Sequence, residues 1–127
     1  MNEVLRQERK FLINLPLMYQ LTDQLSLVMQ EDAHNFGIGY PVRSLYFDTL
    51  DERDFYEKED GVEIRRKFRL RCYGPDSPFA LLEMKQKQGA NQKKRSLRVS
   101  REDAICLTRR EYGVLLNYSE PFAGECY

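Results

Sequence analysis

Residues 65–71 carry a cationic side chain at every second position, which is the spacing of one face of a β-strand. The four cations of this run are Arg65, Lys67, Arg69 and Arg71. Phe68, Leu70 and Cys72 alternate with the basic residues and would form the apolar face of the same strand. Because like charges in one row repel each other, the pattern indicates an anion between them, and a chain of phosphates is the anion we expect.

The charge of the chain is balanced overall but divided along its length. Its 127 residues, 42% of them hydrophobic, are enough for one domain with a core, and 20 basic residues match 20 acidic ones. Seven acids fall within residues 51–63, whereas residues 65–101 hold twelve of the basic residues and two acids. Such a block creates a local field that attracts anions, even at a net charge of zero.

The cysteines and the first residues indicate a cytoplasmic chain. The three cysteines are far apart, and the single histidine could not complete a zinc site with them. Residues 3–10 are charged, which argues against a signal peptide, and no apolar stretch approaches the roughly 20 residues that a membrane span needs. We therefore expect a reduced, cytoplasmic protein without a membrane segment.

Periodicity and turn residues predict an α+β fold, with an antiparallel β-sheet and flanking helices. Strands are expected at residues 4–13, 42–48, 62–73, 79–87 and 92–100. Helices are expected at 16–31 and from Ser100, as the N-cap, to about 117, and a short helical turn or hairpin at 49–61. Turn-forming residues separate the last three strands, which should therefore form an antiparallel meander.

The last strands repeat one theme, an apolar face opposite a face rich in lysine and arginine. The polar face of the last two carries Leu81, Glu83, Lys85, Lys87, Lys94, Ser96 and Arg98. The plain alternative is a sheet whose polar face meets water. Two features favour a function: the face is mostly basic, with isolated acids at Glu8 and Glu83, and opposed cations are destabilising unless an anion offsets them.

If these strands curl into a barrel, the basic face lines a wet interior. There, arginine binds phosphate through two parallel hydrogen bonds, and lysine acts as a point charge. Glu8 and Glu83 would then be ligands of a hard divalent cation, Mg²⁺ or Mn²⁺, shared with phosphate oxygens. The alternative for each glutamate is a salt bridge to a neighbouring lysine or arginine.

Four segments follow one another along the chain: RQERKFLI at 6–13, VRSLYFDT at 42–49, KFRLRCYG at 67–74 and LEMK at 82–85. In this order and spacing they closely resemble the vacuolar transporter chaperone (VTC) domain, the polyphosphate polymerase branch of the triphosphate tunnel metalloenzymes. The resemblance runs from about residue 3 to about residue 117. Within it, we expect Tyr46 to pack in the core.

The resemblance implies a tunnel of antiparallel strands that holds triphosphate or polyphosphate together with a divalent metal, Mn²⁺ or Mg²⁺. Polymerase members transfer the terminal phosphate of a nucleoside triphosphate, such as ATP, to a growing polyphosphate chain. Together with the strand faces, it predicts catalytic roles for Lys10, Arg69, Arg71 and Lys85. It likewise predicts substrate binding by Arg65, Lys67, Lys87, Lys94 and Arg98, and metal binding by Glu8 and Glu83.

The chain is about half as long as the tunnel domains that it resembles. A closed barrel needs about eight strands, against the five expected here. We therefore expect residues 1–127 to be a single truncated domain, the N-terminal half of a tunnel, and a second copy in a homodimer could complete it. This shortness leaves open whether the chain is an enzyme.

Three functions remain open after this comparison: a polymerase, a tunnel-type triphosphate hydrolase, and a half tunnel that binds polyphosphate without turnover. The resemblance favours the first. A nucleic-acid-binding sheet is disfavoured, because the basic faces lack the interleaved aromatic residues that stack on bases and the net charge is zero.

Overall fold

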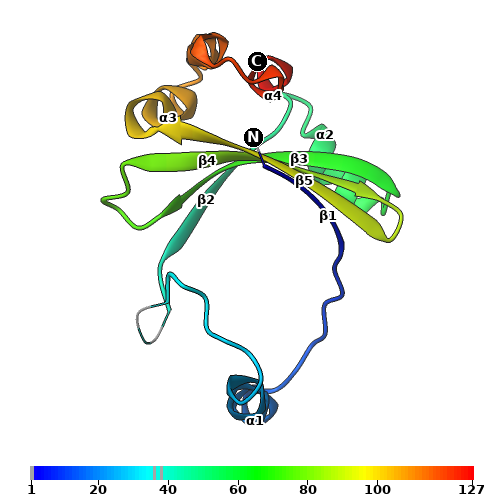
Figure 1. Ribbon diagram of the computed structural model, residues 1–127. Helices are drawn as coiled ribbons and strands as arrows, with labels where there is room; N and C mark the ends of the chain where they lie inside the picture. The colour runs from blue at the N-terminus through cyan, green and yellow to red at the C-terminus, as the bar shows by residue number, and fades with distance from the viewer. Residues whose placement is uncertain (1, 36, 38) are drawn as a thin grey trace. The chain divides into compact units, whose positions relative to one another are not determined.

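The computed structural model describes residues 2–35, 37 and 39–127, shown in Figure 1. Its elements are β1 (Asn2–Gln7), α1 (Leu15–Ser26), β2 (Val42–Phe47), α2 (Arg53–Glu59), β3 (Ile64–Tyr73), β4 (Phe79–Gln88), β5 (Asn91–Ser100), α3 (Arg101–Thr108), the 3₁₀ helix η1 (Tyr112–Asn117) and α4 (Pro121–Cys126). The predicted α+β class, an antiparallel sheet with flanking helices, is confirmed. No helix in the part of the chain that the structure describes is long and apolar enough to cross a membrane.

The chain divides into two compact units. The first comprises Met1–Glu8 and Val42–Tyr127 and contains the whole sheet, and the second comprises Arg9–Pro41 and contains α1. In the second unit, the Asn14 side chain accepts a hydrogen bond from the backbone N–H of Leu17 at 2.9 Å and so caps α1. The helix ends at Ser26, earlier than the expected residue 31.

The sheet has five strands in the order β1-β5-β4-β3-β2, and all neighbours are antiparallel. The predicted meander of β3, β4 and β5 lies at its centre, and the two strands that come first in the chain form its edges. The sheet is open and does not close into a barrel. Gly89, at φ 58°, makes the tight turn between β4 and β5 without the steric cost that other residues meet there.

The core lies between one face of the sheet and the C-terminal helices. Figure 1 shows α3 and α4 on the convex side of the curved sheet. The buried residues come from alternate strand positions and from the helices: Leu70, Ala80, Leu82, Met84, Leu97, Val99, Ala104, Leu107, Leu115, Phe122 and Ala123. Each fully buried leucine or phenylalanine contributes about 1.5–3 kcal/mol, so this face carries most of the stability.

The first strand is shorter than predicted, and the last helix is divided. Strand β1 stops at Gln7, which pairs with Asn91, the first residue of β5. Because β5 begins at Asn91, it offers no partner for the residues after Gln7. The predicted Ser100 N-cap is confirmed by a 3.1 Å hydrogen bond from the Asp103 N–H. A left-handed Arg110, at φ 67°, then ends the helical run, and the chain folds back so that Leu115 is buried.

Helix α4 was not predicted, because its apolar residues are too few to show a period. Arg95 of β5 fastens it to the sheet: the guanidinium carbon lies 4.8 Å from the ring centroid of Phe122. The same guanidinium donates a 2.9 Å hydrogen bond from Nη1 to Oε1 of Glu125. Stacking and pairing of one arginine therefore hold α4 against the sheet. A long apolar helix face, whose period would be visible in the sequence, is not needed.

Candidate functional site

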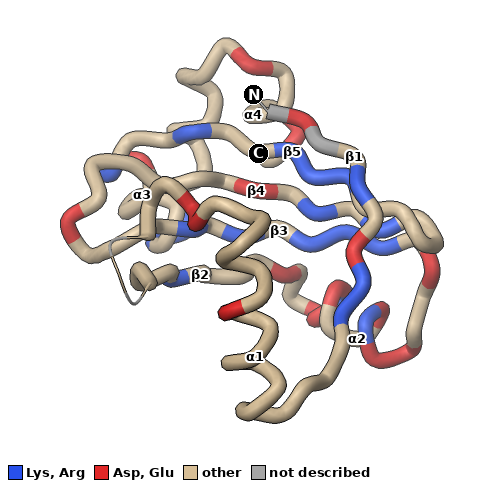
Figure 2. Tube along the Cα trace, turned by 60° about the horizontal axis from the view of Figure 1, so that its bottom comes forward, with Lys and Arg blue, Asp and Glu red and all other residues tan. Residues whose placement is uncertain are grey.

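The sheet face opposite the core carries the predicted basic residues in rows across β3, β4 and β5. We call the following residues the cation face: Arg65, Lys67, Arg69, Arg71, Lys85, Lys87, Lys94 and Arg98. One row joins Lys67, Lys85 and Lys94, and the next places Glu83 directly opposite Arg69. Figure 2 shows the basic residues gathered along these three strands. Cross-strand neighbours lie about 5 Å apart at Cβ, so rows of like charge are costly unless an anion offsets them.

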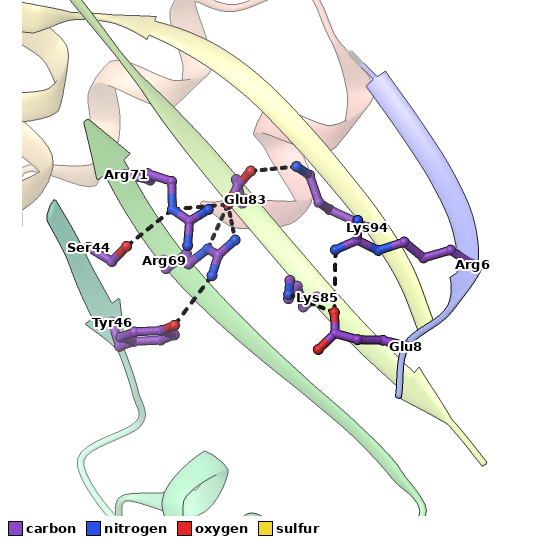
Figure 3. Close-up of polar contacts among 9 residues, drawn as sticks. All are labelled: Arg6, Glu8, Ser44, Tyr46, Arg69, Arg71, Glu83, Lys85 and Lys94. Atoms are coloured by element: carbon purple, nitrogen blue, oxygen red, sulfur yellow. Dashed lines mark hydrogen bonds and ion pairs between the residues drawn. The ribbon is translucent and has the colours of Figure 1, made fainter. Parts of the chain in front are cut away.

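Within the chain, the anion among these cations is the carboxylate of Glu83, which is fully buried. Its Oε2 accepts a 2.6 Å hydrogen bond from Nε of Arg69, and Nη2 of the same arginine forms an ion pair with that oxygen at 2.5 Å (Figure 3). Lys94 places its Nζ 2.8 Å from Oε1, and Nε of Arg71 lies 4.0 Å from Oε2. Arg69 and Arg71 of β3 and Lys94 of β5 therefore converge on Glu83 of β4, and the sequence had predicted all four as site residues.

The pKa values show which charges the cluster maintains. Burial alone would raise the pKa of Glu83, but hydrogen bonds from Lys94 and Arg69, together with their charges, hold it below its ordinary value of 4.5. Burial likewise opposes the charge of Arg69, and hydrogen bonds with Tyr46 and Glu83 outweigh it and raise the pKa. Both partners are therefore ionised at neutral pH.

Glu8 forms a second, looser cluster with Arg6 and Lys85. Nη2 of Arg6 donates to Oε2 of Glu8 at 3.4 Å, and Nζ of Lys85 lies 3.8 Å from the same oxygen. Burial and the positive charge of Arg69 lower the pKa of Lys85, and Glu8 only partly offsets them. Sequence reasoning did not select Arg6, although its spacing of two from Glu8 places both on one face.

The two glutamates differ in how well they suit a metal ion. Arg69 and Lys94 engage the oxygens of Glu83 at short distance, so a divalent cation would meet concentrated positive charge there. The pairs of Glu8 are longer, and 23% of its side chain is exposed. Among residues 2–35, 37 and 39–127, no group of three or more His, Cys, Asp or Glu side chains gathers as a metal site. Glu8 is thus the better candidate, and metal binding stays a prediction.

The remaining predicted residues lie apart from Glu83. Nζ of Lys67 lies 5.6 Å from the ring centroid of Tyr46, and the guanidinium carbon of Arg98 lies 3.8 Å from that of Phe79. Arg65 and Lys87 pair across the strands two rows away from Arg69 and Glu83. Lys10 belongs to the second unit, outside the sheet.

The expectation that Tyr46 packs in the core is wrong. Tyr46 is 52% exposed, and its hydroxyl accepts a 3.4 Å hydrogen bond from Nη1 of Arg69. Two residues earlier, Oγ of Ser44 accepts a 3.2 Å hydrogen bond from Nε of Arg71. The period-two spacing of these two hydroxyls, with Leu45 between them, was the signal that could have found them.

A cavity of about 600 Å³ lies elsewhere, against the helix-covered side of the sheet. Its apolar lining includes Phe47, Phe68 and Leu107, and two acidic residues of α2, Asp54 and Glu57, also line it. Arg65 is the one predicted site residue among those that line it. The chemistry that the sequence predicts therefore belongs to the cation face rather than to this cavity.

Comparison with protein families matches the chain to a family model. The family model described as the VTC domain matches residues 5–125, which include β1 from Leu5 onward and every other element almost to the end of α4. No curated protein and no solved structure matches this chain.

Proposed function

Because this chain belongs to the VTC domain family, the family of polyphosphate polymerases, we propose that its cation face binds the phosphates of polyphosphate and of a nucleoside triphosphate such as ATP. The observation that carries the proposal is the convergence of Arg69, Arg71 and Lys94 on one buried carboxylate. These side chains are already held in place by the protein, so binding a phosphate chain requires little further ordering of them.

The excess of positive charge leaves room for an anionic ligand. Glu83 is the single acid among the strand positions of the cation face, which carries eight basic side chains. A phosphate chain that runs along the row of Lys67, Lys85 and Lys94 would relieve their mutual repulsion. Charge-assisted hydrogen bonds of this kind contribute about 1.5–3 kcal/mol each.

The proposed reaction moves the terminal phosphoryl group of the nucleoside triphosphate to the end of a polyphosphate chain. The bond from the γ-phosphorus to the bridging β–γ oxygen breaks, and a terminal oxygen of polyphosphate forms a new bond to that phosphorus. The nucleoside diphosphate leaves with the electron pair. Arg71, Lys85 and Lys94 would stabilise the charge on the transferred group and on the leaving oxygen. A divalent cation, when bound beside Glu8, would neutralise phosphate oxygens.

The open sheet favours a second candidate, which is binding without turnover. Phosphoryl transfer depends on charge placed around the reacting group, and the five strands supply it from one side.

Incubation with ATP, Mn²⁺ and a short polyphosphate primer separates the three candidate functions. Long polyphosphate and ADP would support the polymerase, free phosphate would support a hydrolase, and a raised melting temperature without products would support a binder.

The binding site itself is tested by a pair of neighbouring lysines of β5. Lys94→Ala removes a cation of the site, and we expect tripolyphosphate to bind about tenfold to hundredfold more weakly by isothermal titration calorimetry. Lys93→Ala is the matched control, because Lys93 lies on the other face and pairs with Glu3 at 3.0 Å. Both variants lose one positive charge, so equal losses of affinity would reject this face as the site.

A further inference from the structure

Arg69 has little surface with which to meet a ligand. The residue is 5% exposed, and its guanidinium nitrogens already have partners in the protein. Nε and Nη2 engage Glu83, and Nη1 donates to the hydroxyl of Tyr46. A phosphate that approaches this part of the sheet therefore meets the half-exposed Tyr46 before it meets the arginine.

Strand β2 repeats this arrangement one row further along. The register pairs Tyr46 with Arg69 and Ser44 with Arg71, so each hydroxyl faces an arginine of the neighbouring strand. Both hydroxyl oxygens accept hydrogen bonds from those arginines. A hydroxyl that accepts a hydrogen bond still has its own proton to donate, and here that proton is available to another acceptor.

We propose that the hydroxyls of Tyr46 and Ser44 are phosphate ligands, each donating a hydrogen bond to a phosphate oxygen and transmitting the positive charge of the arginine behind it. This inference rests on the proposed function and extends the binding site to β2. It assigns contact with the ligand to neutral donors at the edge of the cation face, and to Arg69 the role of polarising one of them.

Two further observations support Tyr46 as a donor. Nζ of Lys67 lies 5.6 Å from the ring centroid, and this cation–π contact restrains the ring. The hydrogen bond from Arg69 lowers the pKa of the Tyr46 hydroxyl against the opposing effect of burial, and the charges of Arg69, Lys67 and Arg71 act in the same direction. A more acidic hydroxyl is a stronger donor to an anion.

A purely structural role predicts a different result from a ligand role. Arg69 keeps its bonds to Glu83 when the tyrosine hydroxyl is removed, so its position does not depend on Tyr46. Tyr46→Phe also keeps the ring under Lys67. A ligand role therefore predicts lost affinity with an unchanged melting temperature of the ligand-free protein.

The test measures tripolyphosphate binding to the full chain by titration calorimetry. We expect the dissociation constant to rise about tenfold to hundredfold in Tyr46→Phe and in Ser44→Ala, because each loses one hydrogen bond to a charged group. Tyr56→Phe is the control, since Tyr56 is a comparably exposed tyrosine of α2 outside the cation face. The ¹³Cζ resonance of Tyr46, which reports on its hydroxyl, should move on binding while that of Tyr56 stays.

The outcomes separate this inference from the proposed function. If Lys94→Ala binds weakly while Tyr46→Phe and Ser44→Ala bind like the parent, the hydroxyls are not ligands and the cation face stands. If ligand-free Tyr46→Phe melts lower in proportion to its lost affinity, the hydroxyl is structural and the inference falls. If Lys94→Ala binds like the parent, the proposed function itself fails.

Discussion

Glu83 is the residue on which the cation face depends, since its carboxylate holds Arg69 and Lys94 at hydrogen-bonding distance in a buried position. Removing one partner of a buried ion pair leaves the other charge without compensation, which costs about 3–5 kcal/mol. We therefore expect Glu83→Gln to lower the free energy of unfolding by that amount, as measured by chemical denaturation. Tripolyphosphate should then raise the melting temperature of the variant more than that of the parent, because it supplies the lost charge.

Glu3→Gln is the matched comparison for that experiment. Glu3 also pairs with a lysine of β5, Lys93, at 3.0 Å, but 47% of its side chain is exposed. Exposed pairs contribute about 0–1 kcal/mol, so the change in stability should be small. Similar losses in Glu3→Gln and Glu83→Gln would contradict the buried character of the Glu83 cluster.

At the scale of elements, the side chain of Asp48 caps α2 from outside the helix. Asp48 follows β2, and its carboxylate accepts hydrogen bonds from the backbone N–H groups of Asp54 at 2.9 Å and Phe55 at 3.1 Å. These groups open α2, whose nominal cap residue, Glu52, makes no side-chain cap. The aspartate therefore joins the end of a strand to the start of the next helix.

Asp48→Ala should cost about 0.5–2 kcal/mol of unfolding free energy, which is the usual cost of losing a helix cap. The affinity for tripolyphosphate should stay unchanged, because Asp48 makes its contacts with the start of α2 and not with the cation face. Denaturation and calorimetry on the same variant measure both quantities, and Asp51→Ala, in the same turn, serves as the control. A loss of affinity as large as that of Lys94→Ala would show that Asp48 takes part in binding.

The strands were predictable from the sequence because each has period two and ends at turn residues. Strand β3, predicted from residue 62, begins at Ile64, and β4 and β5 differ by one residue from prediction. The length of β1 was not predictable, because Phe11 and Leu12 look like strand residues and only the partner strand decides where pairing ends. The break after Thr108 depends on one left-handed residue, for which the sequence offers no turn signal.

The candidate site was predictable as a face but not as a set of contacts. Alternation placed Arg69, Arg71 and Lys94 on one side, as the structure has them. Which of them reach Glu83 depends on strand register, which follows from the hairpins and cannot be read from either strand alone. Tyr46 was misjudged because an aromatic residue in a strand is usually buried, whereas its strand lies at a sheet edge.

At the scale of the whole molecule, the described strands form an open sheet whose edges are β1 and β2. Unpaired edges can take up further strands, and completion of a tunnel by a second copy stays a prediction. Within this sheet, burial and nearby cations together shift the pKa of one lysine, Lys85. Burial and Arg69 lower the pKa of Lys85 from 10.5, with smaller contributions from Arg6 and Lys67.

This lowered pKa predicts proton uptake on binding. A bound phosphate chain favours the charged lysine and raises its pKa, so binding takes up a proton at pH values between the free and bound pKa. Affinity should fall as the pH rises through the lowered pKa of free Lys85, below 10.5. Calorimetry in two alkaline buffers of different ionisation enthalpy measures the uptake.

Lys85→Arg is the control for this measurement, because arginine stays protonated at these pH values and should abolish the uptake. Equal heats in both buffers for the parent protein would show that Lys85 does not sense the ligand.

The buried carboxylate of Glu83 also has a consequence for selectivity. It competes with any incoming phosphate for the positive charge of Lys94, whose Nζ already lies 2.8 Å from Oε1 of Glu83. A single orthophosphate gains too few contacts to outcompete the carboxylate, whereas a chain that spans several rows of the sheet gains contacts that the competitor cannot provide. The protein would thus bind long phosphate chains in preference to short ones, because Glu83 sets the number of contacts that a ligand must gain.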